Sequence, residues 1–148
     1  MVAQDPTGDT AGKVNDIKII FTVVYKDILF TAADIIGDNP NISYELDFNN
    51  DGLHENVIHF KHDRKDADIY KSTKTGVDEL IGNIKVTVNE TIGLMIPVEN
   101  INNPDSIYIR TVTRMPVSES EYVLCDQTDG YYSIHFKWYK NVKCASCT

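Results

Sequence analysis

The sequence predicts an all-β protein built as an antiparallel β-sandwich, Ig-like or jelly-roll-like, with at most one short helix. Three observations favour this fold class. Apolar residues recur at every second position in several segments, which is the period of a strand with one buried face. Clusters of Gly, Pro, Asn and Asp separate these segments at a spacing typical of sandwiches and barrels. No segment carries a sustained apolar stripe at the helical period of 3.6 residues.

The first half of the chain contains two clear strand patterns. One begins at Ile17 and has a nearly all-apolar face at the odd positions Ile17, Ile19, Phe21, Val23 and Tyr25. The other follows the even positions Ile42, Tyr44, Leu46 and Phe48. After a turn, residues 57–60 provide a short return strand.

The second half adds strands at 84–88, where apolar and polar residues alternate, and at 107–113, which is rich in β-branched residues. Near the C-terminus, a long amphipathic strand places on its apolar face Tyr132, Ile134, Phe136, Trp138 and Val142. Residues 122–125 precede it across an Asp129-Gly130 hairpin signal. We therefore expect the last two strands to form an antiparallel pair.

The strand patterns form one domain over residues 17–148, because no linker or internal repeat divides them. Residues 1–16 have few apolar side chains, and we expect them to be a flexible lead-in. Helix signals are weak, and only segments 63–71 and 75–83 have room for one or two helical turns.

Composition excludes several classes of function. The 148 residues contain 14 Lys and Arg against 22 Asp and Glu, a net charge of −8, which disfavours binding to a phosphate backbone. No apolar run approaches the roughly 20 residues needed to cross a bilayer, so we expect no membrane insertion. The first residues also lack the basic and apolar regions of a signal peptide.

One segment, residues 47–55, has the pattern of oxygen-bearing side chains that is typical of a metal-binding loop. Oxygen-bearing side chains occupy loop positions 1, 3, 5 and 9, Gly52 occupies position 6, and the Leu53 carbonyl is available as a main-chain ligand. Short carboxylates and amides around a Gly-permitted bend can supply the six to eight oxygens that Ca²⁺ requires. Mg²⁺ usually keeps more water, and the absence of Cys or a His pair at these positions argues against Zn²⁺.

This segment resembles the D-x-[DN]-x-DG calcium loops of the EF-hand and dockerin type. It is more similar to the strand-loop-strand version in FG-GAP repeats and other extracellular β-modules, which have an acidic residue at position 9. The resemblance implies side-chain ligands at Asp47, Asn49, Asp51 and Glu55, a main-chain ligand at Leu53, and Ca²⁺ as the ion. Position 12 is Ile58, where an EF-hand has a bidentate Glu, so regulation by helix opening is not expected. The alternative is a hairpin turn rich in Asn, Asp and Gly for conformational reasons alone.

Histidines gather at His54, His59 and His62, but a strand places His59 and His62 on opposite faces. We interpret them, like His135, as solvated side chains. No nucleophile, phosphate-loop or zinc-protease motif occurs, so we do not expect an enzyme.

Three cysteines, Cys125, Cys144 and Cys147, are candidates for one disulfide that fastens the C-terminal tail to the sheet. The pairings 125–144, 125–147 and 144–147 remain open. In an exported protein, the third thiol would be left for a partner molecule.

These observations favour a secreted or cell-surface, calcium-stabilised β-sandwich with a structural or adhesive role, such as a fibre or pilus subunit. Its expected partners are other protein subunits or cell-surface components. The alternative is a carbohydrate-binding module with an aromatic platform at Tyr131, Tyr139 and Tyr108. An exposed Trp138 would favour sugar binding, and a buried one the structural role.

Overall fold

The computed structural model describes residues 2–4, 16–37, 41–61, 63–88, 91–116, 122–128 and 132–135. These residues form eleven strands and one short 3-10 turn, η1 (Val98–Ile101). The strands are β1 (Val2–Gln4), β2 (Asp16–Tyr25), β3 (Ile28–Ile36), β4 (Asn41–Asp47), β5 (Asn56–Phe60), β6 (Asp66–Lys71), β7 (Glu79–Val88), β8 (Ile92–Pro97), β9 (Ser106–Pro116), β10 (Tyr122–Gln127) and β11 (Tyr132–His135).

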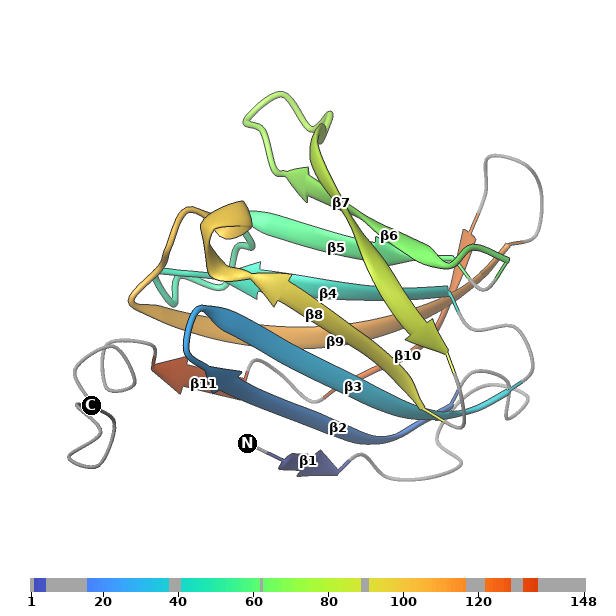
Figure 1. Ribbon diagram of the computed structural model, residues 1–148. Coiled ribbons are helices and arrows are strands. Elements are labelled where there is room, and N and C mark those ends of the chain that lie inside the picture. The colour runs from blue at the N-terminus through green and yellow to red at the C-terminus, as the bar shows by residue number, and fades with distance from the viewer. Residues whose placement is uncertain are drawn as a thin grey trace, which may run out of the picture.

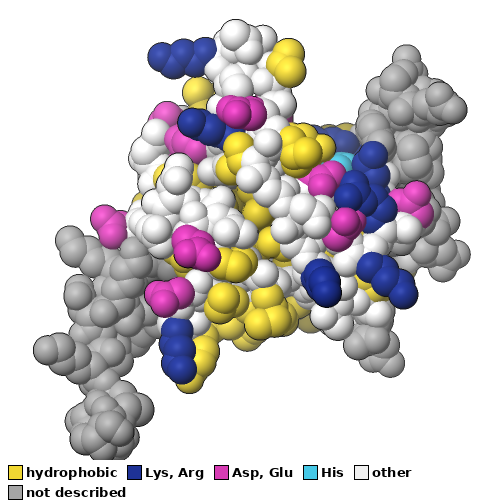
Figure 2. Space-filling view, turned by 45° about the horizontal axis from the view of Figure 1, so that its top comes forward, with side chains coloured by type: hydrophobic (Ala, Val, Ile, Leu, Met, Phe, Trp, Pro, Cys, Tyr) yellow, Lys and Arg dark blue, Asp and Glu magenta, His cyan; other side chains and the backbone are white. Residues whose placement is uncertain are grey.

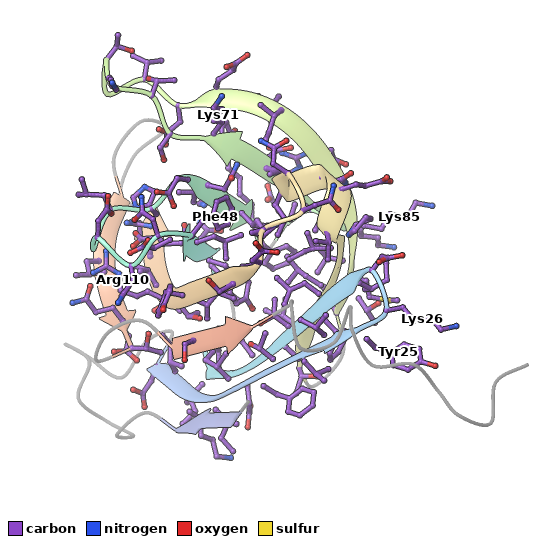
Figure 3. All side chains as sticks on the ribbon, turned by 90° about the vertical axis from the view of Figure 1, so that its left-hand side faces the viewer. Tyr25, Lys26, Phe48, Lys71, Lys85 and Arg110 are labelled. Carbon is purple, nitrogen blue, oxygen red and sulfur yellow. The ribbon has the colours of Figure 1, made fainter. Side chains whose placement is uncertain are left out.

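Every strand pair is antiparallel, and the strand order is β1-β2-β3-β8-β7-β6-β5-β4-β9-β10, with β11 paired to β9. Strand β7 belongs to two layers, because residues 79–85 pair with β6 and residues 86–88 pair with β8. Strand β2 also contacts β9 and β10, near the other end of the order, so the sheet curls into a nearly closed barrel (Figures 1 and 3). The predicted all-β antiparallel fold class is confirmed.

The interior is filled by apolar side chains from nearly all of these strands. The largest fully buried ones are Tyr44, Phe60, Ile17, Ile20, Leu29, Ile42, Leu46, Ile58, Ile69, Leu94 and Ile96. Each such side chain stabilises the fold by about 1.5–3 kcal/mol relative to an exposed one. The predicted inward positions of β4 are confirmed, because Ile42, Tyr44 and Leu46 are all buried.

Strand β2 differs from its predicted orientation. Its inner face consists of Ile20, Thr22 and Val24, whereas Phe21 and Tyr25 are exposed on the outside. A register shift between Ile17 and Ile19 moves one residue out of phase, so the alternation that starts at Ile17 changes face. The apolar odd positions beyond the shift therefore point outward.

The segments with weak helix signals form β6 and the start of β7, and in β6 Ala67 and Ile69 are buried with the two-residue period of a strand. One further prediction is wrong. The last two strands do not pair with each other in the described residues. Both pair with β9, which is long enough to hold β10 along residues 112–116 and β11 along residues 106–109.

A buried hydrogen bond links the two ends of the strand order. The backbone N–H of Ile17 in β2 donates to Asp126 Oδ2 in β10 at 2.7 Å. Asp126 lies at a register shift in β10 and also accepts a bond from the N–H of Gln127 at 2.8 Å. This carboxylate satisfies an edge N–H of β2 that would otherwise be buried without a partner.

Candidate metal centre

The segment 47–55 is the connection of a β-hairpin. Strand β4 ends at Asp47, strand β5 begins at Asn56, and the N–H of Glu55 donates to the Leu46 carbonyl at 2.8 Å. Phe48 is half-buried and packs against the apolar core, within the ring of strands in Figure 3. The loop is therefore anchored on the core side by an aromatic ring and closed at its base by a backbone hydrogen bond.

Asp47 organises the loop from a fully buried position. Its Oδ1 accepts hydrogen bonds from the backbone N–H groups of Asn49 (3.1 Å) and Asn50 (2.7 Å). Its Oδ2 accepts from the N–H of Gly52 at 2.8 Å. The backbone thus wraps around this carboxylate, as Asx turns do when a short acidic side chain caps the following N–H groups.

The other acidic side chains are held facing Asp47. Glu55 Oε2 accepts a bond from the N–H of Phe48 (2.6 Å), and Oε1 accepts from Asn49 Nδ2 (3.0 Å). Asp51 Oδ1 accepts from the N–H of Leu53 at 2.8 Å. One ligand oxygen from each of Asp47, Asp51 and Glu55 lies within 4.8 Å of the others.

This spacing is compatible with one bound metal ion. Oxygens that share an ion at about 2.3–2.6 Å are at most about 5 Å apart, and the cluster lies within that limit. Of the five predicted ligands, the structure thus brings together the three carboxylates. The Asn49 side chain is engaged inside the loop, since its Oδ1 accepts from the N–H of Asp51 at 3.0 Å, and the Leu53 side chain is largely exposed.

Backbone conformation explains two residues of the motif independently of any ion. Asn50 and Gly52 have left-handed φ angles of 60° and 85°, which favour Asn and Gly. Turn chemistry therefore accounts for these positions, but it does not require an acidic residue at position 9. Ile58, at position 12, is fully buried in the core and is not available as a ligand.

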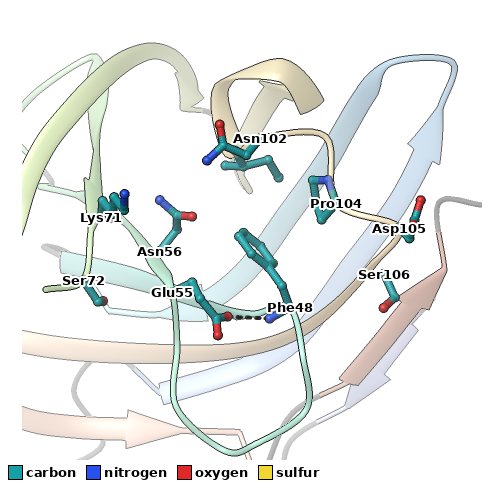
Figure 4. Close-up of a pocket in the computed structure, with 10 residues that line it drawn as sticks. Phe48, Glu55, Asn56, Lys71, Ser72, Asn102, Pro104, Asp105 and Ser106 are labelled. Carbon is teal, nitrogen blue, oxygen red and sulfur yellow. Dashed lines mark hydrogen bonds between the residues drawn. The ribbon is translucent and has the colours of Figure 1, made fainter. Parts of the chain in front are cut away.

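A pocket of about 400 Å³ adjoins the cluster (Figure 4). Its walls come from the loop, from the end of β6 and from the connection between η1 and β9, and they include Phe48, Glu55, Ser72 and Asn102. Glu55 therefore belongs to both the acidic cluster and the pocket wall. The sequence gives no signal for this pocket, because its walls are distant in the chain.

A second polar group covers the outer face of β4. Glu45, which is 6 % exposed, forms an ion pair with Arg110 of β9, whose Nε donates to Glu45 Oε2 at 2.7 Å. Arg114 Nη2 and His54 Nδ1 lie 3.9 and 3.8 Å from the same carboxylate. The alternation of β4 indicates that Ser43 and Glu45 share a face, but the arginines opposite them come from a strand that is distant in the sequence.

His59 departs from the predicted solvated state. Its Nδ1 lies 2.9 Å from Ser43 Oγ, which also accepts a bond from Arg114 Nη1 at 3.0 Å. Burial lowers the pKa of His59, and the positive charges of Lys61 and Arg114 lower it further.

An ion-pair cluster lies on the neighbouring strand. The Arg64 guanidinium bonds Asp66 at 2.6 Å and Asp68 at 2.8 Å, and Asn83 donates to both carboxylates. Hydrogen bonding to Arg64 lowers the pKa of Asp66. For Asp68, burial raises the pKa, but the bonds from Asn83 and Arg64 outweigh burial and lower it overall. Figure 2 shows acidic and basic side chains interspersed on the face that it draws, so the excess of acids forms no continuous patch there.

Other predicted site residues fall partly outside the described residues. Cys125 lies on β10, whereas Cys144 and Cys147 lie outside the described part of the chain, so the disulfide stays a prediction. The same holds for Tyr131, Trp138, Tyr139 and His62. Tyr108 is half-buried on β9.

The fold and the site together define an antiparallel all-β domain with a carboxylate cluster, able to hold a metal ion, at a hairpin loop. Comparisons of the chain with protein-family models, with curated proteins and with solved structures found no match. Among the described residues, no helix has the length and apolar character needed to cross a membrane.

Proposed function

We propose that the loop 47–55 binds Ca²⁺ and that the ion stabilises a structural or adhesive module outside the cell. The observation that carries this proposal is the convergence of Asp47, Asp51 and Glu55 within 4.8 Å. Three carboxylates at this spacing repel one another, and a divalent cation relieves that repulsion. The ion would fasten the end of β4 to the start of β5.

The extracellular location follows from the kind of site. A loop with three carboxylates and no bidentate Glu at position 12 suits the weak affinity of extracellular modules, about 10⁻⁴–10⁻³ M, and such sites are filled only where Ca²⁺ is abundant. Partners would be other protein subunits, as in a fibre or pilus, or cell-surface components. The odd cysteine count allows a cross-link to a neighbour.

A non-enzymatic role is part of the proposal. The described residues contain one Ser-His contact, between Ser43 and His59, but Ser43 is only 2 % exposed. A nucleophile must reach its substrate, so this pair is better suited to holding β4 and β5 together.

Thermal unfolding in millimolar Ca²⁺ and in excess chelator tests the metal site. At a Ca²⁺ concentration 10 times Kd, the free energy of unfolding rises by about 1.4 kcal/mol, which raises Tm by about 3–6 °C for a chain of this length. Asp51→Asn keeps an acceptor for the Leu53 N–H but should abolish most of the rise. Asp78→Asn, which removes an exposed acid outside the loop, should retain it.

Identical unfolding curves in Ca²⁺ and in chelator would reduce the loop to an Asx-rich turn. A calcium titration of the same protein tests the location. A Kd of 10⁻⁶ M or below would contradict an extracellular stabilising site and indicate an intracellular one.

A further inference from the structure

The pocket beside the loop combines an aromatic ring with hydrogen-bonding groups. Its apolar wall is formed by Phe48, Ile101 and Pro104, and Figure 4 shows the Phe48 ring lying between Asn56 and Pro104. The volume of about 400 Å³ is within the range of small-molecule sites. Such a pocket presents an apolar surface to one face of a ligand and polar groups to its edge.

Two polar side chains of this pocket have groups that a ligand can bond. Asn56 Nδ2 donates to the Tyr70 carbonyl at 3.0 Å, which leaves the amide oxygen as an acceptor. The Asn102 side chain is exposed at the rim.

The charges of the pocket limit the ligand class. Lys71 is the one cationic side chain that lines it, and Asp105 lies on the opposite side (Figure 4). Glu55 is already bonded to the N–H of Phe48 and to Asn49. One lysine among acids does not suit a phosphate or another strong anion. A purely apolar ligand would leave the Asn56 amide oxygen without a partner.

We propose that this pocket binds one residue of a neutral carbohydrate. The apolar face of a sugar ring would stack on Phe48, and its hydroxyls would bond the Asn56 amide oxygen and the Asn102 amide. A polyhydroxylated ring is the ligand that has both an apolar face and many donors and acceptors at its edge. This site is distinct from the aromatic platform that the sequence suggests at Tyr131 and Tyr139.

The pocket and the acidic cluster share Glu55. Because the Glu55 carboxylate fixes the N–H of Phe48, an ion bound to the cluster would hold the stacking ring in place. Only this coupling rests on the proposed calcium site. Sugar binding itself does not require it, and the two proposals fail separately.

An array of neutral oligosaccharides is screened first to select the probe. The test is then a two-dimensional amide NMR titration of the full chain with glucose, galactose, mannose and N-acetylglucosamine. Binding should shift the amides of Phe48, Ser72 and Asn102. Asn102→Gly should weaken binding at least threefold, and Phe48→Ala at least tenfold. Asn102→Gly preserves the left-handed backbone at this position, whose φ is 61°, so the fold is kept. Tyr25→Ala removes an exposed aromatic ring outside the residues that line the pocket and should bind like the parent.

No binding to any neutral sugar would overturn the proposal, as would shifts confined to amides elsewhere. Retained affinity in Asn102→Gly would also overturn it. Repeating the titration in chelator separates the two sites. Weaker sugar binding without Ca²⁺ supports the coupling through Glu55, and equal binding contradicts the coupling. A missing sugar response in a protein that Ca²⁺ still stabilises refutes the pocket alone.

Discussion

Replacing Tyr44 by Phe should make the domain more stable. The Tyr44 side chain is fully buried in the core, and its hydroxyl has no hydrogen-bond partner among the described residues. A buried polar group without a partner costs about 1–3 kcal/mol, and removing one oxygen creates only a small void. We expect the free energy of unfolding to rise by about 1 kcal/mol and Tm by about 2–4 °C.

The alkaline pH dependence gives a second readout for the same substitution. Burial raises the pKa of Tyr44 above its unfolded value of 10.0. The unfolded chain therefore releases this proton first, so the contribution of Tyr44 to stability is complete below about pH 10 and is lost as the pH rises further. Tyr44→Phe should flatten the loss of stability above pH 10.

Denaturant unfolding of the parent, of Tyr44→Phe and of Tyr25→Phe measures both effects. Tyr25 is 69 % exposed, so its hydroxyl bonds water and Tyr25→Phe should change stability by less than about 0.5 kcal/mol. A loss of more than about 1 kcal/mol in Tyr44→Phe would refute the reasoning, because it would show that the hydroxyl is bonded in the folded protein, for example to a buried water.

Two further predictions concern buried polar contacts. Asp126→Ala should cost about 2 kcal/mol and speed hydrogen exchange at the Ile17 amide, because that N–H loses its charged acceptor, whereas Asp126→Asn should retain part of the protection. Slow exchange of the Ile17 amide in Asp126→Ala would contradict this prediction, because it would show that another group accepts the Ile17 N–H. His59 has a lowered pKa in the folded state, so the stability it contributes is present above about pH 6.5 and is lost as the pH falls through the folded-state value. Unfolding at pH 7.5 and 5.5 should show a larger acid loss in the parent than in His59→Gln, and equal losses would contradict the buried histidine.

What the sequence predicts well is local. The acidic loop lies within nine consecutive residues. The backbone of these residues sets the conformation of the loop, because the N–H groups of Asn49, Asn50 and Gly52 donate to the Asp47 carboxylate. The all-β class is also a local property, because a period of two can be read within each segment.

What the sequence predicts poorly depends on a phase shift or on distant pairing. One irregular residue between Ile17 and Ile19 is enough to turn Phe21 outward, and nothing in the composition of that segment marks it. The positions of β10 and β11 depend on the length of β9, and the Asp129-Gly130 signal points to a hairpin that does not form between the described parts of these strands. In the described residues, both segments instead pair with the longer strand β9.

The burial of strand β4 predicts where in the molecule a bound ion would change stability most. Its inner side chains, including Tyr44, lie in the core, and its outer face is covered by the pair of Glu45 with Arg110, so the strand is buried on both sides up to Asp47. A strand held in this way has little freedom, and the loop is the first backbone after it that is not paired in the sheet. The N–H of Phe48 binds Glu55, whose own N–H binds Leu46, so any ion that fixes Glu55 also fixes the pocket wall beside it. The effect of Ca²⁺ should therefore be largest at the loop and the pocket and smallest along β4, a distribution that amide hydrogen exchange measures directly.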